Sequence, residues 1–202
     1  MYIPSYYHET DEHKLIGFMQ AYSFAVLISA KLDVAQATHL PFVVENRGNK
    51  IYLVSHLAKA NPQWKEFKEN KLLVIFQGPH GYVSPKHYEK KQNVPTWNYI
   101  AVHAYGKATI INESTAVIGV LEKMILSYES EYYNQWKELP EDYKNKMIKG
   151  IVAFEIEVTH LEGKYKLSQN KSQNEQRAII TAFESSEDSV QQELAKEMKQ
   201  RG

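Results

Sequence analysis

The stretch from Ser55 to Pro62 reads SHLAKANP and combines the residue types that bind a phosphate group. It places a hydroxyl (Ser55), an imidazole (His56) and an ammonium (Lys59) at the end of an expected strand, before an expected helix that Asn61 would cap. Helix N-termini attract anions, because their free N–H groups and the helix dipole point at the ligand. The stretch therefore predicts a phosphate site, although a lysine beside a helix is often only solvated.

Other kinds of site find less support. The chain has eight histidines, but His56, His80, His87 and His103 lack the close helical spacing of zinc ligands, and the absence of cysteine excludes thiolate ligands and disulfides. The serines lack a GxSxG setting, and neither GxGxxG nor GxxxxGK[ST] is present. We therefore expect no metal and can assign no catalytic residue.

Aromatic residues make up 12% of the chain and include 14 tyrosines and three tryptophans. Tyr82, Tyr88, Trp97 and Tyr99 cluster around a polar segment at 78–96 that reads as one long loop. Flat aromatic walls suit a planar heteroaromatic ligand, and the same residues could equally pack a core or a subunit interface. Both interpretations hold together in a dimer whose ligand lies across the interface.

Hydrophobic periodicity and turn residues predict the elements that carry these groups. The expected strands cover 24–30, 35–45, 50–55, 72–77, 97–111 and 151–161, and the expected helices cover 11–21, 61–70, a segment from 113, and 140–150. The fold class is mainly β with flanking helices, in which six or seven antiparallel strands close into a barrel. We expect one domain over 1–170 with a helical insertion near 113–150, and a polar, helical tail over 171–202.

Charge and length narrow the class of protein. The 202 residues carry 24 basic and 24 acidic side chains, which argues against a surface built for nucleic acid. Apolar runs are too short for a membrane-spanning helix, and the first residues lack the apolar core of a signal peptide. Together with the absence of cysteine, this predicts a cytoplasmic protein without membrane contact.

Five segments resemble those of the PaiB family of FMN-binding negative transcriptional regulators. They are ATHLPF (37–42), HLAKANPQW (56–64), VIFQGPHGYVSP (74–85), VPTWNYIAVHAYG (94–106) and GKYKLSQNKS (163–172). PTWNY and FQGPH are the most specific, and the resemblance runs in order over about residues 1–175. It implies an FMN-binding split β-barrel of the pyridoxamine-phosphate-oxidase type, working as a homodimer with FMN at the subunit interface.

The resemblance also implies which residues contact FMN. Those that would line the flavin from the second strand are Thr38, His39 and Leu40. Those that would hold the ribityl phosphate are Ser55, His56, Lys59 and Asn61. Gln77 on the next strand would lie near the isoalloxazine, and Trp97 and Tyr99 would close the pocket from the partner chain. Related oxidases usually carry an arginine before the lysine, whereas Ala58 stands there in this chain.

The family is described in bacilli as repressing protease synthesis and sporulation, which makes negative transcriptional regulation the first hypothesis. An FMN-dependent oxidoreductase of the pyridoxamine-phosphate-oxidase or flavin-reductase type, without direct DNA binding, is the alternative, because FMN itself would carry the chemistry. Direct operator binding by the dimer is a third hypothesis. The charge does not favour it, since no basic recognition helix is evident and the tail from Lys171 is more acidic than basic.

Overall fold

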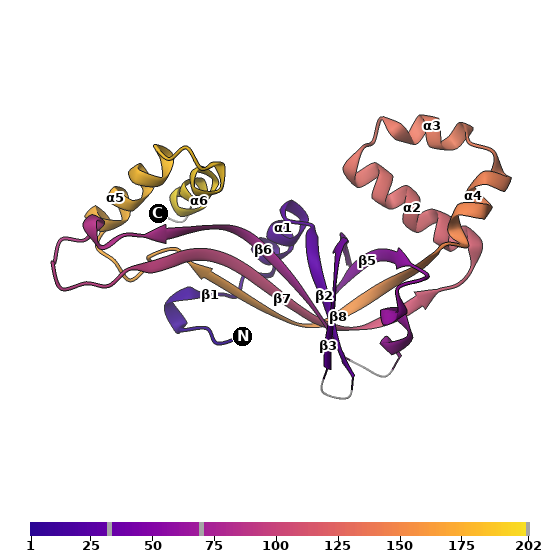
Figure 1. Ribbon diagram of the computed structural model, residues 1–202, viewed down its shortest axis with the longest axis horizontal. Helices are drawn as coiled ribbons and strands as arrows, with labels where there is room; N and C mark the ends of the chain where they lie inside the picture. Colours follow the sequence, from indigo (N-terminus) through magenta and orange to yellow (C-terminus); the bar gives the residue numbers. More distant parts are fainter. Residues whose placement is uncertain (32–33, 69–70, 201–202) are drawn as a thin grey trace. The chain divides into compact units, whose positions relative to one another are not determined.

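A computed structural model describes residues 1–31, 34–68 and 71–200 of the chain. The helices are α1 (Glu12–Ala21), α2 (Ser114–Tyr128), α3 (Tyr132–Glu138), α4 (Glu141–Ile148), α5 (Gln173–Glu184) and α6 (Ser189–Lys199), with 3-10 helices η1 (Ser5–Tyr7), η2 (Pro62–Glu66) and η3 (Pro85–His87). The strands are β1 (His8–Glu9), β2 (Phe24–Lys31), β3 (Val34–Pro41), β4 (Val43–Arg47), β5 (Lys50–Ala58), β6 (Leu72–Val83), β7 (Thr96–Ile111) and β8 (Ile151–Lys166). Figure 1 shows these elements along the chain.

The chain divides into two compact units. The barrel unit consists of residues 16–76 and 103–161, and the hairpin unit, so called after its helices α5 and α6, consists of residues 1–15, 77–102 and 162–202. The long strands β6, β7 and β8 contribute residues to both. No helix among the described residues is long and apolar enough to cross a bilayer.

The strand order of the sheet is β3-β2-β6-β7-β8-β5-β4, and β2 with β3, β2 with β6, β4 with β5 and β5 with β8 all pair antiparallel. Strands β3 and β4 stand at opposite ends of this order, yet only Phe42 separates them in the chain. Seven flat strands would hold their outer members about 29 Å apart, and one residue between two strands reaches about 7 Å. The sheet of the barrel unit must therefore curl round on itself, although its order does not close.

Phenylalanines fill the space inside the curled sheet. Phe42, Phe67, Phe76 and Phe154 are all buried, and the rings of Phe67 and Phe154 lie 4.8 Å apart in an edge-to-face contact. Phe42 meets both Phe76 and Phe154, so the residue that joins β3 to β4 also lies at the centre of the core. This placement ties the curling of the sheet to apolar burial.

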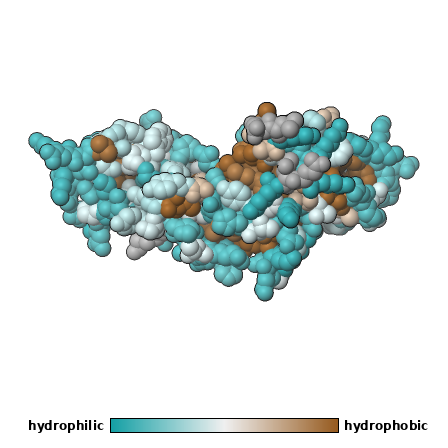
Figure 2. All heavy atoms as spheres, turned by 90° about the horizontal axis from the view of Figure 1, so that it is seen from below, coloured by the Kyte–Doolittle hydropathy of each residue, from teal (hydrophilic) through white to brown (hydrophobic). Residues whose placement is uncertain are grey.

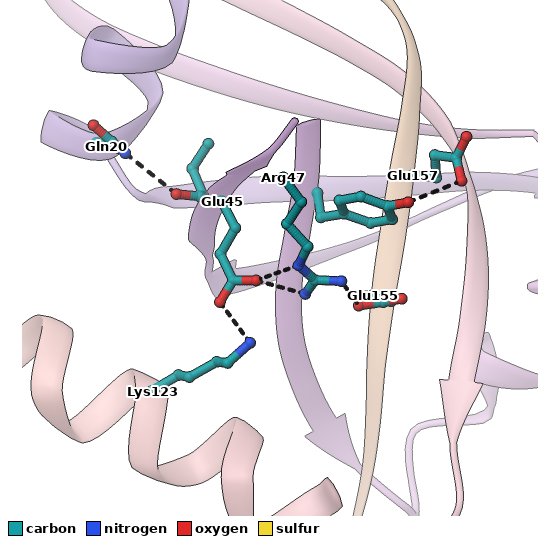
Figure 3. A network of polar contacts seen from close by, with 8 residues as sticks. Gln20, Glu45, Arg47, Lys123, Glu155 and Glu157 are labelled. Carbon is teal, nitrogen blue, oxygen red and sulfur yellow. Dashed lines mark hydrogen bonds and ion pairs between the residues drawn. The ribbon is translucent and has the colours of Figure 1, made fainter. Parts of the chain in front are cut away.

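Helices α2, α3 and α4 pack together as an insertion between β7 and β8 (Figure 1). An ionic network joins α2 to the sheet: Lys123 meets Glu45 at 2.6 Å, and Glu45 also pairs with Arg47, which reaches Glu155 on β8 (Figure 3). Burial opposes it, but hydrogen bonds from Lys123 and Arg47 hold the pKa of Glu45 below its ordinary value. The network fixes α2 beside β4.

In the hairpin unit, α5 and α6 lie side by side and cover β6 (Figure 1). Ser172 and Glu175 form a capping box that begins α5. A Cβ at Gly81 would meet the Phe183 ring at 2.9 Å and Leu194 at 3.1 Å, so the glycine allows the close packing of the helical pair on the strand.

The split-barrel expectation is confirmed, and several details differ. The structure has eight strands, since the two-residue β1 pairs with β8. The loop expected at 78–96 is shorter in the structure, because β6 continues to Val83 and β7 begins at Thr96, which leaves 84–95 as the loop with the short η3 inside it. Turn-forming glycine and proline are tolerated in β6, whose burial alternates along its length. The sequence also missed α3.

The helix expected at 61–70 is the 3-10 helix η2, Pro62–Glu66. Its expected end at Asn70 lies outside the described residues. Phe67, just after η2, is buried, but the side of η2 that faces the sheet is polar, since Gln63 and Glu66 are buried while Trp64 is half exposed. A five-residue 3-10 helix cannot supply the extended dipole on which the phosphate argument relied.

Candidate lysine-lined cavity at the end of β5

Strand β5 presents Ser55 and His56 to opposite sides, and neither is exposed. Ser55 is fully buried, and its hydroxyl donates to the Pro41 carbonyl at 2.7 Å, which connects β5 to the end of β3. His56 places Nδ1 3.2 Å from Met124 Sδ of α2, and burial lowers its pKa below the ordinary 6.5. Both side chains therefore position the end of β5 from within the protein.

Lys59 lies immediately after β5 and lines a cavity of about 740 Å³ in the barrel unit. Its backbone N–H donates to the Gly150 carbonyl, and its carbonyl accepts from the Trp64 indole at 3.1 Å. These two bonds fix the main chain at Lys59 between the insertion and η2. The ammonium itself remains exposed at the cavity.

The lining of this cavity combines apolar, basic and neutral polar side chains, the last being Thr109, Asn112 and Ser114. Lys59, Lys68 and Lys149 all line it, and its described lining residues include no aspartate or glutamate. The apolar walls come from β7, β8, η2, α2 and α4; they are Trp64, Ala108, Ile110, Ile111, Val117, Ile148, Ile151 and Val152. The volume falls within the range of small-molecule and cofactor sites. A ligand with a flat apolar body and an anionic end matches this lining.

Thr38 and Asn61, expected at the flavin and at its phosphate, contact each other and are not among the described residues that line the cavity. Asn61 Nδ2 donates to Thr38 Oγ1 at 2.9 Å, and Asn61 Oδ1 accepts from the Gln63 backbone N–H as the cap of η2. The Thr38 hydroxyl in turn donates to Gln63 Oε1. This chain of bonds joins the β3 strand to the start of η2.

Gln63 is the residue at this junction that the sequence did not single out. It is 1% exposed, and its amide nitrogen reaches the carbonyls of Leu27 and Gln36 and the hydroxyl of Ser29. Ser29 also donates to the buried Glu66 carboxylate at 2.6 Å. The only available signal was the Asn61-Pro62 start of η2, which predicts a helix but not which side of it is buried.

The remaining predicted residues are dispersed. His39 is exposed on β3 with its ring 6.3 Å from Phe24, while Leu40 is buried. Gln77, Trp97 and Tyr99 belong to the hairpin unit. Of the ten predicted residues, Lys59 alone is among the described residues that line the cavity.

In the hairpin unit, two of the four aromatic residues singled out from the sequence, Tyr82 and Trp97, lie next to each other. Trp97 is 52% exposed, and its ring lies 5.9 Å from Tyr82 and 6.1 Å from His80. Tyr99 is half exposed, with Lys164 Nζ 5.3 Å from its ring centroid. The described residues contain no group of three or more histidine or acidic side chains arranged to hold a metal ion.

Solved structures with the same arrangement of strands are flavin-binding proteins. The flavocytochrome Anf3 of Azotobacter vinelandii superposes with a TM-score of 0.63 at 15% identity, covering 81% of this chain and 72% of that one. An FAD and heme binding protein of Mycobacterium smegmatis gives 0.63 at 16% identity, covering 85% and 78%. The curled sheet is thus the fold of the split-barrel flavoproteins.

The family follows from sequence. Residues 1–160 match the family described as "Putative FMN-binding domain". The chain is 36% identical to "Protease synthase and sporulation protein PAI 2" of Bacillus subtilis (strain 168), over 98% of this chain and 96% of that protein. The chain belongs to this FMN-binding family, the PaiB family.

The residues present fit FMN. Three lysines without an acidic neighbour in the lining provide a place for its phosphate, and the apolar walls provide contacts for its ring system. When bound, FMN would supply redox chemistry or a light-absorbing and redox-sensitive group. The protein's own contribution is to bind and orient it.

Proposed function

We propose that Lys59 binds the FMN phosphate at the end of β5 and that the flavin extends along the apolar walls of the 740 Å³ cavity. The single observation that carries this proposal is a cavity lined by three lysines and apolar side chains, with no acidic residue among its described lining, in a member of an FMN-binding family. Lys68 and Lys149 neutralise the second phosphate charge. The short η2 contributes through the lysine that precedes it, not through a helix dipole.

The other predicted residues take supporting or partner-side roles in this proposal. Ser55 and His56 hold the end of β5, and Thr38 and Asn61 hold η2, so these four orient Lys59 without touching phosphate. His39 on β3 and Gln77 on β6 are exposed and contact the flavin of the second copy, whereas Leu40 is buried and supports β3. Trp97 and Tyr99 close the site from the second copy.

The dimer itself is part of the proposal. Large hydrophobic side chains are exposed in both units, among them Phe24 (66%), Val34 (62%) and Trp97 (52%). Figure 2 shows such hydrophobic residues gathered in patches between hydrophilic ones. Exposed apolar patches mark interaction surfaces in otherwise polar proteins. Sedimentation of the purified chain at micromolar concentration should give twice the mass of one chain; a monomer there would exclude the dimer.

Flavin titration tests the site. Quenching of FMN fluorescence should saturate with the wild-type protein, and Lys59→Met should weaken binding about 30-fold, because a charge-assisted contact of about 2 kcal/mol is lost. Lys107→Met is the matched control, since Lys107 is an exposed lysine on β7 that does not line the cavity. Equal affinity of the Lys59 and Lys107 variants would show that the phosphate binds elsewhere.

We infer that the biological role is negative regulation of transcription, acting on protease synthesis and sporulation as in the family. Support comes from the 36% identity to the Bacillus subtilis protein over nearly the whole of both chains. The cytoplasm is the compartment such a role requires. Deleting the gene should raise secreted protease activity, and the wild-type gene should restore repression while Lys59→Met should not. Unchanged protease activity on deletion would contradict the regulatory role.

Two further measurements separate how repression is achieved. Net charge is zero, so we propose an indirect route rather than direct operator contact. A gel shift should show no sequence-specific complex; one that weakens steeply with salt would establish direct binding instead. Steady oxidation of NADH or NADPH by the FMN-loaded protein would favour the oxidoreductase alternative.

A further inference from the structure

The hairpin unit contains a second cavity, of about 220 Å³, that no FMN role uses. Strand β7 contributes Thr96 and Asn98, and the segment after β8 contributes Ser168 and Lys171. Lys166 at the end of β8 and Tyr88 after η3 add an ammonium and a phenol to the lining. The volume is below the range of cofactor-sized sites, so a ligand there must be small.

The Tyr88 hydroxyl is an unsatisfied polar group beside this cavity. Tyr88 is 8% exposed, and its Oη is buried with no hydrogen-bond partner anywhere in the described parts of the chain. A buried hydroxyl without a partner destabilises the folded protein, and such groups in native proteins call for an explanation. A ligand that accepts the hydroxyl proton would remove that cost.

Two ammonium groups lie in the same lining. Lys171 Nζ stands 3.8 Å from the centre of the Tyr88 ring and donates to Asn93 Oδ1 at 3.1 Å. Lys166 Nζ donates to Thr96 Oγ1. An ammonium has three donors, so each lysine keeps N–H groups for a ligand after these bonds. The described lining residues include no carboxylate that would neutralise the two charges.

The main chain at the cavity is held in an uncommon conformation. Ser168 has φ = 64°, in the left-handed region that residues other than glycine rarely adopt. Its hydroxyl and the buried Asn98 amide exchange two hydrogen bonds, which hold it there. Backbone strain of this kind gathers at binding sites when the surrounding structure maintains it.

Charged groups outside the lining also bear on the cavity. Backbone hydrogen bonds and the charge of Lys171 lower the pKa of Glu175, burial and the Glu175 charge raise the pKa of Tyr88, and Lys164 is a second ammonium near Lys166. The Glu175 carboxylate is engaged by the backbone N–H groups of Ser172 and Glu89. It is therefore committed to the start of α5 and leaves the two cavity lysines available.

We propose that this cavity binds a small oxyanion, a phosphate, sulfate or short carboxylate group, between Lys166, Lys171 and the Tyr88 hydroxyl. The donors outnumber the acceptors, the charge is positive, and the volume admits a compact anion but not a flavin. The site is separate from the FMN site proposed at Lys59, and all of its lining residues belong to the hairpin unit.

Inorganic phosphate is the probe, titrated by calorimetry into the full chain saturated with FMN so that the flavin site is occupied. Saturable binding should weaken at least tenfold in Lys166→Met and in Lys171→Met. Lys91→Met, an exposed lysine of the same unit that does not line the cavity, should bind as the wild type does. Sulfate and acetate, titrated in the same way, identify which oxyanion geometry is preferred.

Tyr88→Phe gives an independent readout. Without phosphate the variant should melt at the wild-type temperature or above it, because an unpartnered hydroxyl is removed, and the rise in melting temperature with phosphate should shrink. Lys59→Met, titrated with phosphate in the absence of flavin, should bind phosphate as the wild type does. This result does not depend on whether FMN binds at Lys59, so the two proposals can fail separately. Absence of saturable phosphate binding, or equal loss in Lys91→Met, would overturn the proposal.

Discussion

The two cavities use their polar groups in opposite ways. In the barrel unit, three lysines share the cavity lining with apolar side chains, and Ser55, Asn61 and Gln63, whose hydrogen bonds hold β5 and η2, are not among the described lining residues. In the hairpin unit, the lining is itself a hydrogen-bonded set in which the Tyr88 hydroxyl alone lacks a partner among the described residues. The first arrangement suits a large ligand with one charged end, and the second suits a compact anion.

Each unit also contains a glycine that is closely packed against neighbouring atoms. Substitutions at these two glycines should give the largest difference in stability between the units. A Cβ at Gly106 of β7 would lie 2.4 Å from the Glu157 carbonyl, which is backbone, whereas one at Gly81 would meet side-chain atoms of Phe183 and Leu194. Backbone cannot move aside as a side chain can. Gly106→Ala should therefore cost about 3 kcal/mol of unfolding free energy and Gly81→Ala about 1 kcal/mol, measured by urea denaturation.

The control for both is Gly119→Ala in α2, where nothing lies within 4 Å of the added Cβ. It should stabilise the protein by about 0.5 to 1 kcal/mol, since alanine favours a helix over glycine. Equal costs at Gly106 and Gly81 would mean that the two units tolerate packing changes alike.

A substitution beside Lys59 should change FMN binding in the barrel unit without changing phosphate binding in the hairpin unit. Ala58→Arg would add a guanidinium at the exposed end of β5, where related oxidases carry an arginine, and should tighten FMN binding about tenfold. It should leave phosphate binding in the hairpin unit unchanged. The matched control is Ala60→Arg, in the turn just beyond Lys59. If fluorescence titration gives the same gain for both arginines, the effect is general electrostatic attraction.

Helices α2 and α4 line the larger cavity but not the smaller one. Loosening these helices should therefore weaken FMN binding and leave phosphate binding unchanged. Lys123→Met removes the contact of α2 with Glu45 and should cost about 0.5 kcal/mol, a small value because Lys123 is 44% exposed and screened by solvent. FMN binding should weaken a few-fold in fluorescence titration. Lys146→Met on α4, an exposed lysine outside the cavity lining, should change neither quantity.

The smallest expected effect concerns pH. Burial lowers the pKa of His56 in the barrel unit, and burial together with Lys86 lowers that of His87 in the hairpin unit. The unfolded chain takes up these protons first, so the stability that neutral histidine contributes is present above about pH 6.5 and lost as the pH falls through the folded pKa. His56→Gln should flatten unfolding free energy between pH 7 and 5 more than His87→Gln, because His56 is buried more deeply. Equal slopes in the two variants would contradict this ranking.

The parts of the fold that the sequence predicted are those with local signals. The alternating residues from Ile151 predicted β8, and Asn61-Pro62 predicted a helical start at η2. Gly78, Pro79 and Gly81 are typical of turns, so the sequence predicts a strand that ends at Gln77. Tertiary packing outweighs these residues, and β6 continues to Val83. Gln63 could not be found, because its burial depends on the β2–β3 hairpin, whose strands are distant in sequence.

Phe42 carries a consequence for how the chain folds. The β2–β3 and β4–β5 hairpins follow one another within residues 24–58 and can form from local contacts, yet they end at opposite ends of the strand order. Strands β6, β7 and β8 must then enter between the two hairpins. The pairing of β5 with β8 places Leu53 opposite Ile156, about a hundred residues further along the chain. Loop closure over that span is slow. We therefore expect the central strands to pair late in folding, after the two local hairpins have formed on either side of Phe42.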